Sequence, residues 1–176
     1  EVRFSSKLEY IKSNNGKIKS IIVNGDEIPC DALVLALGHS SRDTYEMLHK
    51  IGIFMEPKAF AIGVRIEHPQ EMINVGQYGK MASHPRLHAA SYNLTYQSKD
   101  LGRGVYSFCM CPGGVVVAAA SEENRLVSNG MSYHARDKAN SNSALVVTVG
   151  PEDFEGTSVL RGMELVEGTI KPQFSY

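Results

Sequence analysis

The stretch that decides the fold is DALVLALGHS, residues Asp31 to Ser40. An acidic residue opens an almost unbroken apolar run, Ala32 to Leu37, which stops at Gly38. A short continuous apolar run is typical of a strand buried on both faces, as in the middle of an α/β sheet. A glycine allows close backbone approach, and in open α/β sheets ligands bind at the carboxyl ends of strands. The stretch therefore predicts one edge of a cofactor site.

The residues before this stretch predict a small antiparallel meander. Strand-like runs cover residues 2–4, 8–11 and 17–23, and the Asn-Asn-Gly turn at residues 14–16 joins the last two. The Asn24-Gly25 pair is the strongest short hairpin signal in the chain. The chain then returns through residues 27–29 and leads directly into the Asp31 strand.

A helix is predicted directly after the stretch. Ser40 is its expected N-cap, and Asp43 places a negative charge in the first turn, where it suits the helix dipole. Glu46 and Lys50 form an i,i+4 pair in the favourable order. Gly52 is placed to end the helix as its C′ residue.

From Ile53 onward the pattern becomes strand-rich. A short helix is expected after Pro69, and one amphipathic helix is expected near residues 159–166. The predicted strands cover residues 59–66, 91–97, 104–111, 115–120 and 142–149. Many strands with few helices predict an α+β fold rather than repeated βαβ units. We expect two domains, residues 1–52 and 53–176.

Composition limits the classes of function. The chain has 176 residues, and 18 basic against 19 acidic residues give a net charge of −1. No basic block stands out, so nucleic acid and an anionic membrane are not expected partners. No apolar run approaches the roughly 20 residues that span a bilayer. Three cysteines are too few for a disulfide framework, which favours a cytoplasmic location.

Four strings carry a resemblance to a known family. They are VLALGHSSRDTYEML, AFAIGVRIEHPQ, YSFCMCPGGVVVAAASEENRLVSNGMS and NSALVVTV, in this order between about Asp31 and Val149. Together they resemble an uncharacterised group of bacterial FAD-dependent oxidoreductases, often labelled NAD- or FAD-utilising dehydrogenases. The resemblance implies a dinucleotide-binding fold with an inserted second domain.

The resemblance also implies which part of that plan is present. The sequence has no G-x-G-x-x-G after a strand, which is the motif that places a pyrophosphate at a helix N-terminus. We therefore expect a middle or C-terminal piece of a longer flavoprotein. It would comprise the meander and one strand of the flavin domain, followed by the inserted substrate-side domain. The parent would bind FAD, with NAD(P)H as an electron donor, and this piece alone would not retain FAD.

Gly38-His39-Ser40 is the first candidate for cofactor contact. By resemblance it corresponds to a second FAD-contacting turn, where a strand ends against the dinucleotide. From spacing alone, an ordinary strand-to-helix turn is the favoured interpretation, and only the resemblance favours cofactor contact.

Cys109-Met110-Cys111-Pro112-Gly113-Gly114 is the second candidate. On a regular strand Cys109 and Cys111 would project to the same face. Three interpretations stay open: a thiol pair facing the flavin, metal ligands, or two buried inert thiols. In the last case Gly113 and Gly114 would allow close approach of flavin or substrate. We name both cysteines as catalytic candidates and predict no metal site.

The segment from Asn129 to Arg136 is the third candidate, predicted as a polar loop between strands. Asn129, Gly130 and Met131 are candidate cofactor contacts. Arg136 is a catalytic candidate that would hold an anionic substrate or stabilise reduced flavin, and His134 would exchange protons. A solvated loop is the competing interpretation.

Arg65, Glu67 and His68 lie on or just after a predicted strand. Because side chains alternate along a strand, Arg65 and Glu67 share a face, and we expect a structural ion pair between them.

The sequence thus predicts a fragment of an FAD-dependent oxidoreductase that acts on a small-molecule substrate. Its partner would be the remainder of the parent flavin domain, and oligomeric state is left open. Two alternatives stay open: a ligand- or partner-binding module without catalysis, and a thiol redox protein built around Cys109 and Cys111.

Overall fold

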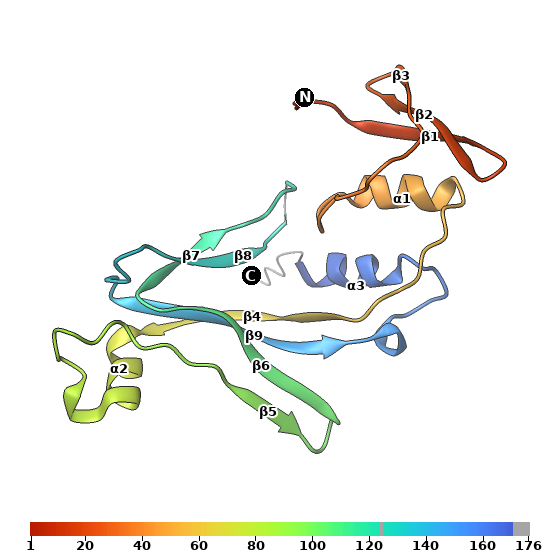
Figure 1. Cartoon of the computed structure of the whole chain (residues 1–176). Coiled ribbons are helices and arrows are strands. Elements are labelled where there is room, and N and C mark those ends of the chain that lie inside the picture. Colours follow the sequence, from red (N-terminus) through yellow and green to blue (C-terminus); the bar gives the residue numbers. More distant parts are fainter. Residues whose placement is uncertain (124, 171–176) are drawn as a thin grey trace. The chain divides into compact units, whose positions relative to one another are not determined.

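The protein consists of two compact units. A computed structural model describes residues 1–123 and 125–170. Unit 1 comprises residues 1–57 and 156–163, and unit 2 comprises residues 58–155 and 164–170. Antiparallel sheets with few helices confirm the predicted α+β class (Figure 1). The end of the second predicted domain lies outside the described residues, and the domain division at residue 52 stays a prediction.

Unit 1 contains the predicted meander. Strands β1 (Leu8–Asn14), β2 (Lys17–Val23) and β3 (Asp26–Pro29) form an antiparallel sheet in the order β1-β2-β3. Both two-residue turns have positive φ at both positions, +49° and +73° at Asn15-Gly16 and +51° and +86° at Asn24-Gly25. This is the type I′ conformation, whose twist matches that of the flanking strands. The first strand begins at Leu8, so the expected strand character of residues 2–4 is wrong.

Helix α1 (Arg42–Lys50) follows as predicted, with one change at its start. The N-cap is Ser41 rather than Ser40, and the backbone N–H of Thr44 donates to Asp43 Oδ1 at 2.8 Å. At the other end Gly52 has φ +81° and donates its N–H to the His49 carbonyl.

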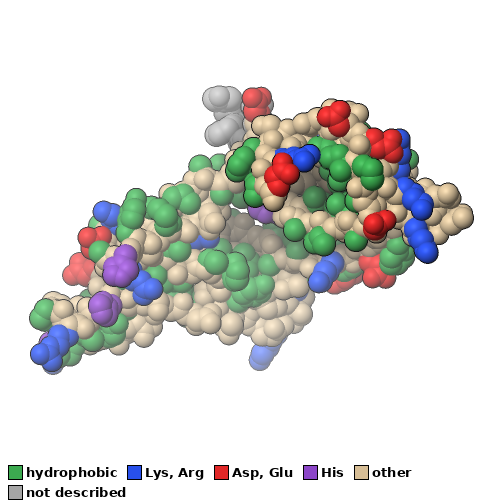
Figure 2. Space-filling model, turned by 45° about the horizontal axis from the view of Figure 1, so that its top comes forward, with side chains coloured by type: hydrophobic (Ala, Val, Ile, Leu, Met, Phe, Trp, Pro, Cys, Tyr) green, Lys and Arg blue, Asp and Glu red, His purple; other side chains and the backbone are tan. Residues whose placement is uncertain are grey.

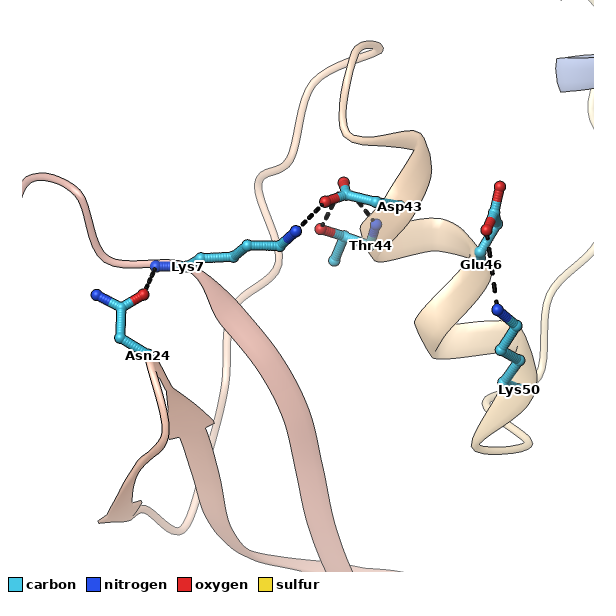
Figure 3. Close-up of polar contacts among 6 residues, drawn as sticks. All are labelled: Lys7, Asn24, Asp43, Thr44, Glu46 and Lys50. Carbon is cyan, nitrogen blue, oxygen red and sulfur yellow. Dashed lines mark hydrogen bonds and ion pairs between the residues drawn. The ribbon is translucent and has the colours of Figure 1, made fainter.

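Two ion pairs involve side chains on the surface of α1 (Figure 3). Lys7, just before β1, reaches Asp43 Oδ2 at 2.6 Å, and its N–H donates to Asn24 Oδ1 at 2.9 Å. The predicted Glu46–Lys50 pair is present at 3.9 Å. The Lys7–Asp43 pair therefore links the meander to α1 inside unit 1.

The apolar stretch after Asp31 is not the buried strand that the sequence predicts. Residues 31–40 pair with no strand among the described residues, and Val34 is 89% exposed. Leu33 and Leu35 instead line a cleft of about 570 Å³ together with Ile11 and Ile51. The run has the composition of a central strand, but burial needs hydrogen-bonded neighbours on both edges. The described chain supplies neither neighbour.

Unit 2 is built on a four-stranded antiparallel sheet (Figure 1). Its order is β4-β9-β6-β5, and β7 and β8 form a separate two-stranded ribbon. The strands are β4 (Phe60–Pro69), β5 (Thr95–Ser98), β6 (Arg103–Cys111), β7 (Gly114–Ala118), β8 (Ser128–Ser132) and β9 (Asn140–Val149). β4 and β9 pair over ten residues without a register shift, from Phe60 opposite Val149 to Pro69 opposite Asn140. The segment at Asn129, which the sequence predicts as a loop, is instead a strand at residues 128–132 that pairs with β7.

Helix α2 (Gln70–Tyr78) is fixed to the sheet by the buried side chain of Gln70. Its Nε2 donates to the Ala90 carbonyl at 2.9 Å, and its Oε1 accepts the Gly113 N–H at 2.7 Å. Asn74 Oδ1 accepts the Ala90 N–H at 2.9 Å. Two side chains thus hold the segment near residue 90 against the helix.

The remaining elements are short. They are η1 (Gly79–Met81), η2 (Pro151–Asp153) and α3 (Arg161–Ile170). None of the helices among residues 1–123 and 125–170 combines the length and hydropathy needed to cross a bilayer. On the face drawn in Figure 2, hydrophobic side chains are exposed between side chains of both charges.

Candidate functional site

A polar cluster lies on one face of the unit 2 sheet, where β4 and β9 run side by side. Arg65 is opposite Ala144 and Glu67 is opposite Asn142, so Arg65 and Asn142 are diagonal neighbours on one face. Arg65 Nη1 donates to Asn142 Oδ1 at 2.8 Å. Asn142 is 0% exposed. We call Arg65, Asn142, Asn129 and the Cys109 carbonyl the arginine cluster.

Every acceptor of the Arg65 guanidinium is neutral. Nη1 also reaches the carbonyl of Cys109 at 3.4 Å, and Nη2 reaches Asn129 Oδ1 at 3.4 Å. Among the described residues no carboxylate forms an ion pair with Arg65. The expected Arg65–Glu67 pair is therefore wrong, because the guanidinium turns across the sheet to amide and carbonyl oxygens.

Two buried donors in the cluster have no partner among the described residues. They are Nε of Arg65 and Nδ2 of Asn142. The amide orientation of Asn142 follows from its oxygen accepting the Arg65 bond, which leaves the NH₂ group free to donate. In arginine, Nε and Nη2 form the edge that binds carboxylates and phosphates with two parallel hydrogen bonds. The cluster is thus cationic and rich in donors, and two of its buried donors lack an acceptor among the described residues.

A β-bulge in β6 shapes the site. The β6–β9 register shifts between Phe108 and Cys111, and Cys109 has φ +47°. The bulge breaks the regular alternation on which the predicted shared face of Cys109 and Cys111 depends. Cys111 Sγ donates to the Cys109 carbonyl at 3.3 Å, and both residues are free thiols. Cys109 is exposed and Cys111 is half-buried, so the interpretation with two buried thiols is wrong for Cys109.

Gly130 gives the arginine cluster its space. A Cβ at this position would overlap Asn142 Oδ1 and meet Arg65 Nη1 at 2.5 Å and Cys111 Sγ at 2.9 Å. Only a residue without a side chain can lie there while the three side chains keep their places. The contact of Gly130 with a cofactor stays a prediction, and the structure shows a packing reason for a glycine at this position.

The two glycines after Cys111 also pack against protein. A Cβ on Gly113, which has φ +50°, would overlap the carbonyl of Arg136, and a Cβ on Gly114 would overlap the carbonyl of Met131. At both glycines, the group that approaches closely is thus a main-chain carbonyl of this protein. Their contact with flavin stays a prediction.

Arg136 lies in the turn after β8 with φ +52° and is exposed. Met131 and Asn129 lie on β8, and of these Asn129 belongs to the arginine cluster. Among the described residues no group of three or more His, Cys, Asp or Glu side chains is arranged to hold a metal ion.

The Gly38-His39-Ser40 turn lies in unit 1. Gly38 has φ +67°, and its carbonyl accepts a hydrogen bond from the Tyr45 hydroxyl at 2.7 Å. His39 is exposed, and Ser40 is half-buried. The turn is held by α1, and its contact with FAD stays a prediction.

The sequence does not identify Arg65 and Asn142 as site residues. One signal was present: AFAIGVRIEHPQ places an arginine directly after an apolar run, and NSNSALVV begins a strand with four polar residues. Neither pattern shows that the two meet, because they are 77 positions apart.

Comparison with known proteins gives two matches. The family described as "FAD-dependent protein, C-terminal domain-like" matches residues 59–175. An uncharacterized protein of Clostridium beijerinckii (strain ATCC 51743 / NCIMB 8052) is 74% identical over 164 residues. That alignment covers 93% of this chain and 31% of the relative, so the chain spans about a third of the relative's length.

Proposed function

Since this chain belongs to the FAD-dependent protein, C-terminal domain-like family, we propose that it is part of an FAD-dependent oxidoreductase. Unit 2 would supply the face that meets the flavin and a small-molecule substrate. FAD, when bound, supplies the electron transfer, and the protein supplies position and electrostatics. The arginine cluster is the observation that carries this proposal.

The donors of the cluster fit an acceptor-rich group. The Nε–Nη2 edge of Arg65 and the NH₂ group of Asn142 offer hydrogen atoms and accept none. The pyrimidine edge of a flavin carries carbonyl oxygens, and it gains negative charge on reduction. A substrate carboxylate would likewise need hydrogen-bond donors and a nearby positive charge. The half-buried guanidinium has only neutral partners among the described residues, and its buried Nε has none. An anionic or carbonyl group at Nε would lower the cost of that arrangement.

Unit 1 would contribute the edge of the dinucleotide-binding domain. Residues 32–37 have the composition of a central strand, yet no strand pairs with them among the described residues. The C. beijerinckii relative, about three times as long as the aligned segment, has sequence from which neighbouring strands can come. Gly38, at the end of this stretch, would then lie at the cofactor edge.

Titration of the chain with FAD tests whether this chain can bind the cofactor without the phosphate-binding part of the flavin domain. The chain lacks the glycine-rich phosphate motif, so we expect no stoichiometric binding by flavin absorbance and fluorescence. The C. beijerinckii relative, purified from a heterologous host, is expected to be yellow, bleached by a reductant and restored by air. Tight FAD binding by the chain, or a colourless and folded relative, contradicts the proposal.

A matched pair of arginine variants tests the site. In the longer protein that carries this chain, Arg65→Met is expected to lower the flavin reduction potential, because a cation near the reduced flavin is lost. Arg136→Met, which removes an exposed arginine of the same unit, serves as the comparison. If only Arg136→Met shifts the potential, the flavin-facing role belongs to Arg136, as the sequence predicts.

The proposed electron donor is tested by mixing the oxidised protein with NADH and with NADPH in turn. Bleaching of the flavin absorbance identifies the donor.

A binding module without catalysis is the second candidate, and one observation favours it. Among the described residues the arginine cluster contains no histidine or carboxylate to move a proton. A parent that binds flavin yet shows no reduction by any donor and no turnover would support this candidate.

A further inference from the structure

The second face of the β4–β9 pair carries a separate cleft. Side chains alternate along β4, so Ile66 and His68 lie on the face opposite to Arg65. There a cleft of about 370 Å³ is lined by Ile66, His68, Met72, Ile73, Tyr92 and Leu94, with Gly76 and Gln77 completing it. An apolar cavity of roughly 150 Å³ already accommodates benzene, so this cleft has room for a ligand of one to two rings.

Two buried polar atoms at this face lack partners among the described residues. Nε2 of His68 is one, and Oγ of Ser141 is the other. His68 and Ser141 are directly opposite each other in the β4–β9 register. Buried polar groups are nearly always satisfied, so two unsatisfied atoms at neighbouring positions indicate a missing hydrogen-bonding group.

The aromatic wall is placed for a flat ligand. The Tyr92 ring lies 5.5 Å from the His68 ring, at an interplanar angle of 33°. Burial raises the pKa of the Tyr92 hydroxyl, and a hydrogen bond with Ser143 opposes that shift. Tyr92 is thus held neutral with its hydroxyl already engaged, which leaves the His68 nitrogen as the polar group that a ligand can meet. Met72, across the cleft, offers a polarizable side chain that packs well on aromatic rings.

The walls of the cleft are fixed before any ligand arrives. Gln70 and Asn74 hold α2 and Ala90 together through three hydrogen bonds. Further along this wall Ser107 Oγ accepts the Leu94 N–H at 2.7 Å. A pocket with fixed walls loses little entropy on binding, and ligand sites are usually preformed in this way.

We propose that this cleft binds a small hydroxylated aromatic molecule whose hydroxyl donates a hydrogen bond to Nε2 of His68. The ring packs between Tyr92, Met72 and Ile73, and the hydroxyl satisfies the buried imidazole nitrogen. This site is independent of the flavin proposal, because it lies on the other face of the β4–β9 pair.

The test uses 2-naphthol and its capped analogue 2-methoxynaphthalene, titrated into the full 176-residue chain. The chain has no tryptophan, so naphthyl fluorescence is followed without an indole background. We expect saturable binding of both, with 2-naphthol roughly three- to tenfold tighter because only its hydroxyl can donate. Absence of saturable 2-naphthol binding, or equal affinity for both compounds, overturns the proposal.

Three variants locate the site. His68→Phe keeps an aromatic ring at this position but removes the imidazole nitrogens, and it is expected to abolish the preference for 2-naphthol. Gly76→Leu places a bulky side chain at the cleft lining and is expected to weaken the binding of both compounds. A Cβ at Gly76 meets nothing within 4 Å, so the backbone there accepts a side chain without a clash at Cβ. Val75→Ala, on the same helix but outside the cleft lining, is the control and is expected to bind as the parent does. Unchanged binding in Gly76→Leu, or a preserved preference in His68→Phe, overturns the assignment.

A second measurement needs no variant. In the unsubstituted chain, the His68 ring signals in NMR spectra, assigned through the backbone, are expected to shift more with 2-naphthol than with 2-methoxynaphthalene. Equal shifts with both compounds overturn the hydroxyl–imidazole contact even if His68→Phe fails to fold.

Discussion

Arg65 Nη1 lies 2.8 Å from Asn142 Oδ1 and donates a hydrogen bond across the β4–β9 pair. The two residues are 77 positions apart, and the bond joins a guanidinium that has no acidic partner among the described residues to a fully buried amide. Neither group has a second good partner, so each depends on the other for its place in the sheet.

This dependence predicts strong coupling between the two positions. Arg65→Met leaves the buried Asn142 amide without its side-chain partner, and Asn142→Leu leaves the guanidinium with only its two longer contacts, to the Cys109 carbonyl and Asn129 Oδ1. Each single variant is expected to lower the free energy of unfolding by about 1–3 kcal/mol. The double variant should lose less than the sum, with a coupling of about 0.5–3 kcal/mol. Urea unfolding of the four proteins measures this, and simple additivity would show that the bond contributes nothing.

Gly130 and Gly76 should respond oppositely to the same substitution. Gly130→Ala places a methyl group against Asn142 Oδ1, Arg65 Nη1 and Cys111 Sγ, and is expected to destabilise by about 1–3 kcal/mol. Gly76→Ala lies in α2, where the added Cβ meets nothing, and is expected to stabilise by about 0.5–1 kcal/mol. Thermal unfolding of both variants provides the comparison. A tolerated Gly130→Ala would mean that the arginine cluster has spare room.

Stability of unit 1 should depend on the ionisation of Asp43. The hydrogen bond from Lys7 lowers the pKa of the Asp43 carboxyl, and the Thr44 N–H adds to the effect. A carboxyl with a lowered pKa in the folded state stabilises above its unfolded pKa. That contribution is lost as the pH falls through the folded value. The stability difference between the parent and Asp43→Asn should therefore be small but positive at pH 6 and vanish in strong acid.

Lys7→Met is the control for this pH dependence. It removes the main cause of the shift, so Asp43→Asn in that background should change the acid limb of the stability curve much less. High salt should weaken the pair in the parent, because both side chains are largely exposed. Denaturant midpoints across the pH range measure both effects. An unaltered pH dependence in Lys7→Met would assign the effect to the helix N-terminus alone.

The two cysteines of β6 should differ in reactivity. Cys109 is exposed at the bulge, whereas Cys111 is half-buried and bonds to the Cys109 carbonyl. A thiol reagent such as Ellman's reagent should therefore modify Cys109 first, and Cys109→Ser should remove the fastest phase. Peptide mass spectrometry identifies the site. Earlier modification of Cys111, or joint loss of both thiols in a single oxidation step, would favour the redox-pair interpretation.

The elements predicted well are those whose cause is local. The two Asn-Gly turns adopt positive φ because the flanking strands need that twist, and Gly52 ends α1 because it accepts φ +81°. Pro69 at the start of α2 belongs to the same class. Each of these signals is contained within a few residues.

The predictions that failed concern contacts between distant segments. The apolar run after Asp31 predicts burial, but its exposure depends on which strands lie beside it. The Asn129 segment has a loop-like composition, yet it pairs with β7 as a strand because main-chain pairing tolerates polar side chains. Arg65 and Glu67 share a face, which predicts an ion pair between them. The Arg65 guanidinium instead turns toward Asn142, and only the tertiary structure shows this.

By itself, the sequence determined the α+β class, the meander, the turns, helix α1 and the extent of most strands, because short-range propensity and periodicity specify them. The tertiary structure alone decided that Arg65 meets Asn142, that β6 bulges at Cys109, and that His68 faces a cleft on the other side. These depend on register and strand order, which join residues far apart in the chain and leave no local signal.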